Sequence, residues 1–167
     1  MKLLSYNNVP LINKSDFGNF IQSQIVFDLH ILSYIDNEGR QIFVDSLVEL
    51  HSNLDKTVKV ESMERYNRPI NDVCKRIHDD YDQADVVTCH AFMSSAGSRS
   101  FDMHIDAEDV IIHTVYGTKH MMIEGVGEVQ INSGEYYHIP QGTAHKALNY
   151  EESLILSFGM EKFFCDR

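Results

Sequence analysis

The sequence predicts a mainly β domain with an α flank, and three observations support this prediction. From residue 85 onward, short runs that alternate apolar and polar residues are separated by glycine-containing turns. Regular short strands of this kind are typical of a closed barrel or of two facing sheets. Residues 1–85 instead mix helical and strand patterns. The chain has 167 residues, 43% of them hydrophobic, with no repeat or linker, so a single domain over 1–167 is expected.

The flank, residues 1–85, is expected to wrap outside the β core. Capping residues and the spacing of apolar side chains predict three helices there, and alternation predicts two strands. In order, they are a helix capped by Ser15 or Asp16 and ending near 23, a strand over 24–35, a helix capped by Asp45 or Ser46 that carries Leu47, Leu50 and Leu54, a strand over 57–61, and a helix from Pro69 to about 82. The last helix is amphipathic, so its apolar face needs a sheet to cover.

The core, residues 86–160, is expected to consist of short strands. They cover 85–94, 100–106, 110–116, 118–123, 128–131, 135–139, 144–148 and 153–159. Turn signals separate them, among them Gly117, Gly134 after Asn132-Ser133, and Gly142 after Pro140. The number and length of these strands suit a barrel or a two-sheet sandwich.

Three residues of the core are candidate metal ligands. His104 and Asp106 stand two positions apart in a predicted strand, so their side chains point to the same face. His145 follows after several further strands, a length that allows the chain to cross a sheet and return. Two histidines and one carboxylate, with open positions opposite them, form the ligand set of non-haem Fe(II) oxygenases. A hydrogen-bonded polar cluster without metal is the alternative.

A second His-x-Asp triplet, His78-Asp79-Asp80, shows why context matters. It lies in the predicted helix of residues 69–82. Two positions along a helix are about 200° apart, so those side chains diverge and hold no ion.

The segment around His145 resembles the second sequence motif of the cupin superfamily. The matching positions are Gly134, Pro140, Gly142, His145 and Asn149. The first half, His104-Ile-Asp106 followed by Gly117 and Lys119, departs from ordinary cupins, which have His-x-His and a later Glu. It resembles instead the JmjC-type branch, the Fe(II)- and 2-oxoglutarate-dependent oxygenases that include asparaginyl hydroxylases and ribosomal-protein oxygenases. This resemblance, over about 86–160, implies a double-stranded β-helix.

The resemblance also implies a cosubstrate site. In that branch a basic residue at the position of Lys119 pairs with the distal carboxylate of 2-oxoglutarate. Alternation places Lys119 on one face with Met121 and Ile123, and a charge among apolar neighbours needs a counter-ion. Thr114 shares a face of its predicted strand with Val110 and Ile112, so it would line the pocket or be a core threonine. Asn149 would touch the cofactor or cap a turn.

The predicted activity is therefore hydroxylation of a C–H bond in a protein, a peptide or a small molecule, with Fe(II) and 2-oxoglutarate. Two alternatives remain open at this point. A metal-dependent cupin of other chemistry, such as an isomerase or a dioxygenase without cosubstrate, would keep the triad but not need Lys119. A non-catalytic binding module would keep the barrel and tolerate loss of any ligand.

Composition restricts the partners and the compartment. The net charge of -11 opposes nonspecific binding to nucleic acid and favours a basic peptide, a basic protein or a small molecule. The three cysteines, Cys74, Cys89 and Cys165, form no Cys-x-x-Cys pair, so reduced thiols are expected. The opening residues lack the apolar core of a signal peptide and no run is long enough for a membrane span. A cytoplasmic protein without a membrane partner is expected, while its oligomeric state stays open.

Overall fold

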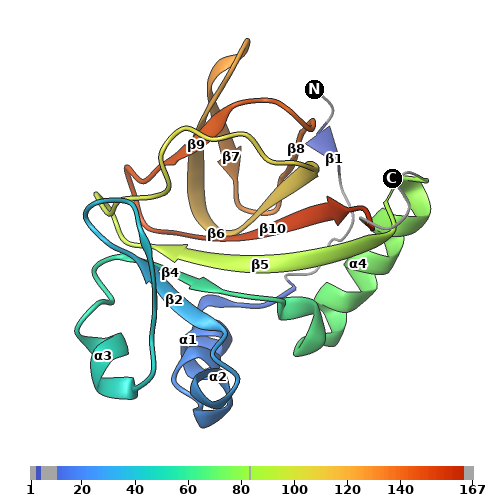
Figure 1. The fold of residues 1–167 in the computed structure, drawn as a ribbon. Helices are drawn as coiled ribbons and strands as arrows, with labels where there is room; N and C mark the ends of the chain where they lie inside the picture. The colour runs from blue at the N-terminus through green and yellow to red at the C-terminus, as the bar shows by residue number, and fades with distance from the viewer. Residues whose placement is uncertain (1–2, 5–10, 83, 164–167) are drawn as a thin grey trace.

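The computed structural model of the chain describes residues 3–4, 11–82 and 84–163. Within them, ten strands form an antiparallel β structure with helices along one side (Figure 1). The strands are β1 (Leu3–Leu4), β2 (Leu32–Ile35), β3 (Gln41–Phe43), β4 (Thr57–Val60), β5 (Val86–Ser94), β6 (Asp109–Ile123), β7 (Gly127–Asn132), β8 (Tyr136–Ile139), β9 (His145–Leu148) and β10 (Ser153–Glu161). The helices are α1 (Lys14–Ile21), α2 (Gln24–Asp28), α3 (Leu47–His51), the 3-10 helix η1 (Met63–Arg65) and α4 (Arg68–Asp80). The predicted fold class is confirmed.

Strand β6 belongs to both layers of the fold. Its first half pairs with β8 and β10, in a sheet whose order is β1-β8-β6-β10-β5-β4-β2-β3. Its second half pairs instead with β7 and β9. Figure 1 shows β7 and β9 above β10 and β5, with β6 rising between the two layers. Side chains that point inward from both layers therefore face a shared interior.

The two faces of β10 separate the apolar core from this interior. Leu154, Leu156 and Phe158 join the large hydrophobic cluster that also contains the buried side of α4. The intervening residues, among them Ser157 and Gly159, line a pocket on the other face. Alternation along one strand thus places the helices on one side of the sheet and the pocket on the other.

The flank was predicted well where capping signals were strong. Ser46 caps α3, since its Oγ accepts a hydrogen bond from the Glu49 N–H at 3.2 Å. Helix α4 has Pro69 in its first turn and is capped by Asn67. The cap of α1 is Asn13, not Ser15 or Asp16, because the Asn13 side chain accepts the Asp16 N–H.

Two strand predictions were wrong. Residues 24–35 form helix α2 and then β2, because Val26 and Phe27 are buried by a single helical turn and His30, at φ 53°, redirects the chain. Residues 100–106 form a loop, in which His104 alone makes a β-bridge, to His145. The alternation in these segments was compatible with a strand, but only residues 32–35 of the first segment pair with neighbouring strands, β3 and β4.

None of the helices in the described part of the chain is long and apolar enough to cross a membrane. Cys74 and Cys89 are buried free thiols, and burial raises the pKa of Cys74 to about 12. Cys165 lies outside the described residues.

Gly117 allows the predicted strands 110–116 and 118–123 to form the single strand β6. Its φ is +71°, and the pairing of β6 with β10 shifts register beside it. A Cβ at this position would lie 2.2 Å from the backbone oxygen of Glu152. Only glycine fits this bend, where β6 passes from one layer to the other.

We expect Gly117→Ala to lower the free energy of unfolding by about 2–4 kcal/mol, because strain at positive φ and a backbone clash add up. Gly125→Ala is the matched control, since Gly125 has φ +76° and open space where a Cβ would stand. That variant should lose only about 1 kcal/mol. Urea unfolding of both variants measures the difference, and equal losses would contradict a role for the close approach to Glu152.

Candidate active site

The three predicted ligands come together at one point. The backbones of His104 and His145 exchange two hydrogen bonds, of 3.1 and 2.9 Å, and their ring centroids are 4.5 Å apart. Asp106 lies between the rings, with its carboxylate oxygens 3.6 Å from His104 Nε2 and 3.3 Å from His145 Nε2. One ligand atom from each residue lies within 4.8 Å of the others. No other such group of His, Cys, Asp or Glu occurs within the described ranges.

Backbone carbonyls orient both imidazole rings. His104 Nδ1 is 2.8 Å from the backbone oxygen of Asp102, and His145 Nδ1 is 2.9 Å from the backbone oxygen of Thr143. A carbonyl can only accept, so Nδ1 carries the proton and Nε2 presents a lone pair to the site. The Gly142 N–H also donates a hydrogen bond to the backbone oxygen of Asp106 at 3.4 Å, which connects the Asp106 loop to the turn before His145.

The electrostatics of the triad favour an ionised carboxylate. The hydrogen bond from His145 lowers the pKa of Asp106, although burial opposes this. Burial lowers the pKa of His145, but its hydrogen bonds to Asp106 and to the Thr143 backbone oxygen, together with the charge of Asp106, raise it overall. Asp106 is therefore in the ionised form that a metal ligand requires.

Lys119 is a buried amine with no carboxylate partner. It is 1% exposed, and its Nζ donates to Ser94 Oγ at 3.3 Å and to Asn149 Oδ1 at 2.5 Å. No Asp or Glu of the described segments forms an ion pair with it. Burial lowers its pKa to about 7. An ammonium group has three donors, so one N–H remains for a ligand.

Asn149 lies behind Lys119. Its Nδ2 donates hydrogen bonds to Thr57 Oγ1 at 3.2 Å and to the backbone oxygen of Ser98 at 2.9 Å. These bonds direct Asn149 Oδ1 toward the Lys119 amine. Asn149 is not among the residues that line the pocket. The structure therefore places it in contact with Lys119 and not at the pocket surface.

Thr114 is fully buried and also lies outside the pocket lining. Its Oγ1 has no hydrogen-bond partner in the part of the chain that the structure describes. Its backbone N–H and oxygen bond to Glu135 and Gly134.

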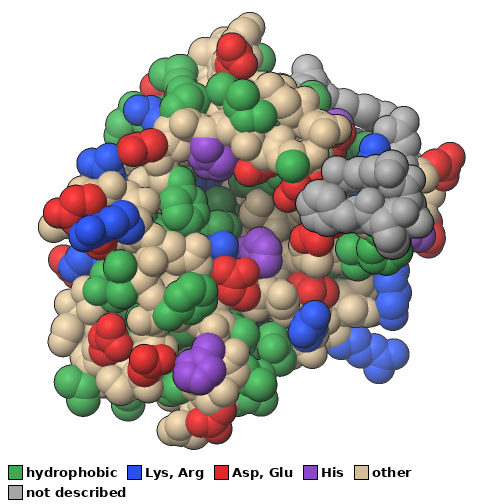
Figure 2. All heavy atoms as spheres, in the orientation of Figure 1, with side chains coloured by type: hydrophobic (Ala, Val, Ile, Leu, Met, Phe, Trp, Pro, Cys, Tyr) green, Lys and Arg blue, Asp and Glu red, His purple; other side chains and the backbone are tan. Residues whose placement is uncertain are grey.

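One pocket of about 280 Å³ contains both the triad and Lys119. Apolar side chains of both layers form much of its wall, including Phe92, Met121 and Ile155. Figure 2 shows that this face of the molecule is hollowed near its centre, with histidine, basic and acidic side chains around the hollow.

Further polar residues line the same pocket. Thr88 and His90, which alternate on β5, are two of them. Lys59, which also lines the pocket, was missed. Its Nζ pairs with Glu61 Oε1 at 2.8 Å, although Glu61 itself is outside the pocket lining. Thr57, Lys59 and Glu61 are at alternate positions along β4 and just beyond it, so the sequence alone could have shown that they share a face. That this face is directed to the pocket follows only from the pairing of β4 with β5.

Comparisons with known proteins show a likeness of fold. No protein-family model and no curated protein matches the sequence. Among solved structures, the ribosomal oxygenase YcfD from Escherichia coli, in complex with cobalt and succinic acid, superposes with a TM-score of 0.74 at 14% identity over 97% of this chain. The same oxygenase in complex with cobalt and 2-oxoglutarate gives 0.72 at 15% identity.

This chain spans about half of that oxygenase, since the match covers 48% of YcfD in each case. At this level of identity the likeness concerns the backbone. The resemblance to oxygenases in the sequence is therefore matched at the level of the fold: this chain has the fold of about half of a ribosomal oxygenase.

Proposed function

We propose that the protein is an Fe(II)- and 2-oxoglutarate-dependent oxygenase that hydroxylates a C–H bond of a protein, a peptide or a small molecule. One observation carries the proposal. The pocket that contains two histidines and an aspartate at one point also contains a buried lysine amine that, among the described residues, has no carboxylate partner. A metal ion and a dicarboxylate would satisfy these groups together.

The triad fits Fe(II). Two imidazole nitrogens and one carboxylate converge from one side, and this ligand set with open positions is typical of non-haem Fe(II) oxygenases. The fixed Nδ1 protons keep both Nε2 atoms available as ligands. The carboxylate offsets part of the metal charge.

The space between the triad and Lys119 fits 2-oxoglutarate. On β6, Lys119, Met121 and Ile123 share a face, and His145 pairs with Ile123. Lys119 and Ile123 are four residues apart, about 13 Å along the strand. The length of the lysine side chain makes the distance from its amine to the triad shorter than this. Met121 and Ala147 line the pocket between the two points, so the middle of the ligand would meet apolar walls.

Bound Fe(II) supplies the chemistry that activates dioxygen, converts 2-oxoglutarate to succinate and carbon dioxide, and oxidises a C–H bond. Lys119 would hold the distal carboxylate and so orient the keto-acid end toward the triad. Asn149 would act through Lys119 by fixing its amine. Thr114 would make no contact with the cosubstrate, because its hydroxyl is buried outside the pocket lining. Phe92, Met121 and Ile155 would exclude water from the site.

The triad predicts metal binding. We expect Asp106→Ala to lower the affinity for Co(II), an air-stable substitute for Fe(II), by more than about 100-fold, since loss of a ligand costs more than loss of a supporting residue. Isothermal titration calorimetry measures the affinity. The control is Asp80→Ala, which removes the aspartate of the second His-x-Asp segment on α4 and should change nothing. Equal affinities of the two variants would contradict the metal site.

Lys119 predicts a pH-dependent affinity for 2-oxoglutarate. The pKa of its amine is lowered to about 7, so above that pH the free protein must take up a proton to form the ion pair. The affinity of the Co(II)-loaded protein for 2-oxoglutarate should therefore fall up to about tenfold per unit as pH rises above 7. Lys119→Met should lower the affinity at pH 6.5 by about 100-fold and remove this dependence.

2-Oxobutyrate, which lacks the distal carboxylate, is the control ligand. It should bind wild type and Lys119→Met equally at each pH. If 2-oxoglutarate and 2-oxobutyrate respond alike to the variant, Lys119 does not hold the distal carboxylate, and a metal-dependent cupin of other chemistry becomes the better explanation.

A further inference from the structure

The pocket extends beyond the part that the cosubstrate would fill. Its floor on β5 is formed by Thr88, His90, Phe92 and Ser94, which alternate along the strand. Ser94 contacts Lys119, whereas Thr88 lies six residues away, about 20 Å along an extended strand. The end of the pocket around Thr88 and His90 is therefore left for the substrate.

Lys59 supplies hydrogen-bond donors to this end. Its Nζ is 2.8 Å from Glu61 Oε1 and lies 5.7 Å from the ring centre of Phe92 and 6.0 Å from that of Phe101. The side chain is 13% exposed. Glu61 uses one of the three ammonium donors, so two N–H groups remain beside the aromatic rings.

His90 adds a neutral donor next to Lys59. The Ser62 N–H donates to His90 Nδ1 at 3.1 Å, so the ring proton stands on Nε2. Burial, together with the positive charge of Lys59, lowers the pKa of His90. Its Nε2 has no hydrogen-bond partner among residues 11–82 and 84–163.

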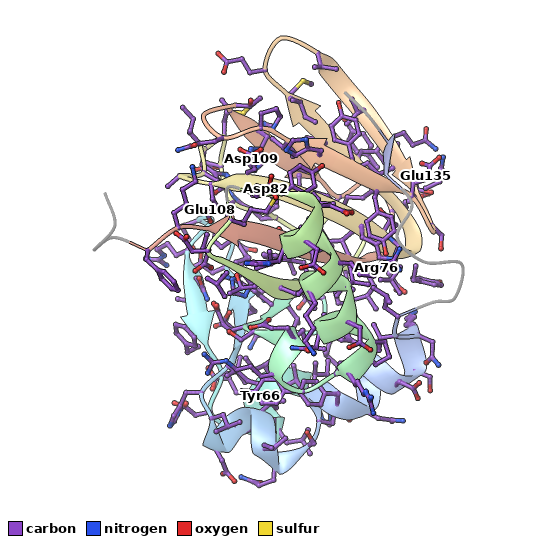
Figure 3. The ribbon with its side chains drawn as sticks, turned by 90° about the vertical axis from the view of Figure 1, so that its right-hand side faces the viewer. Tyr66, Arg76, Asp82, Glu108, Asp109 and Glu135 are labelled. Atoms are coloured by element: carbon purple, nitrogen blue, oxygen red, sulfur yellow. The ribbon has the colours of Figure 1, made fainter. Side chains whose placement is uncertain are left out.

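Acceptors lie at the far side of the same end. Glu161 accepts a hydrogen bond from Thr88 Oγ1 at 2.6 Å. Glu108 lies near the same point, since a Cβ placed on Gly159 would stand 3.6 Å from both Glu108 Oε1 and Thr88 Oγ1. Figure 3 shows Glu108 beside Asp82 and Asp109 near the end of α4, and these three residues line an adjoining pocket.

The spacing of donors and acceptors suits a small zwitterion. Thr88, beside the acceptors, and His90, beside the donors, are successive residues on one face of β5, about 7 Å apart. A carboxylate and an ammonium group on one carbon atom, each with a hydrogen-bond partner, span a similar length. The volume of about 280 Å³, shared with a cosubstrate, is small compared with pockets for drug-sized ligands.

On this basis we infer that the substrate is a free α-amino acid, whose carboxylate is held by Lys59 and His90 and whose ammonium group is held by Glu161 and Glu108. This inference rests on the proposed function, because it assumes that the cosubstrate fills the Lys119 end. The remaining side chain would extend past the triad.

The test uses the twenty standard L-amino acids as probes on the whole chain loaded with Co(II) and 2-oxoglutarate. Ligand-observed NMR identifies binders, and calorimetry measures their affinity. We expect the α-N-acetyl and the α-carboxamide derivatives of a binder to bind at least about tenfold more weakly, since each removes one charge-assisted contact. In Glu161→Gln, the free amino acid and its α-N-acetyl derivative should bind with similar affinity. In Lys59→Met, the free amino acid and its α-carboxamide derivative should do so.

Matched controls are Glu151→Gln and Lys75→Met, which change the same charges at exposed positions outside the pocket. Both should behave as wild type. If 2-oxoglutarate binds but no amino acid does, or if a capped Ala-Arg-Ala peptide binds more tightly than any free amino acid, this inference is wrong and the proposed function stands. If 2-oxoglutarate itself does not bind, the proposed function fails, and the inference fails with it.

Discussion

Burial of the Lys119 amine is the constraint on which the rest of the pocket depends. Removing an ammonium group from water costs several kcal/mol unless it is paired. Here Nζ donates hydrogen bonds to two neutral groups, Ser94 Oγ and Asn149 Oδ1. Asn149 is in turn held by Thr57 and Ser98, so loops and strands far apart in the chain converge on this amine. A negatively charged ligand would therefore stabilise the Lys119 ammonium group within the pocket that also contains the triad.

The fold brings these groups together through one strand. β6 pairs with β10 in its first half and with β9 in its second half, and the bend at Gly117 joins the two. Lys119 lies just beyond the bend, while His145 pairs with the end of the same strand. The separation of Lys119 from His145 is therefore set by the rise of a single strand, whereas His104 and Asp106 reach the site from a loop.

The sequence predicted much of the core and less of its surroundings. Apolar runs bounded by turn residues located β5, β7, β8 and β10 to within a few residues. His104, Asp106 and His145 were identified from residue type and spacing, although residues 100–106 are a loop and not a strand. The position of Asn149 behind Lys119, and the entry of Lys59 into the pocket, depend on strand pairings over long separations. Local patterns carry no information on such pairings.

The most direct test is an anaerobic titration of the metal-free protein with Fe(II) and then with 2-oxoglutarate, followed by visible absorption. A keto acid chelated to Fe(II) gives a weak charge-transfer band in the visible range. Our account predicts that the band appears in wild type and is absent in Asp106→Ala. Tight binding of Fe(II) without any band on addition of saturating 2-oxoglutarate would contradict it, because the metal and the cosubstrate would then not meet in this pocket.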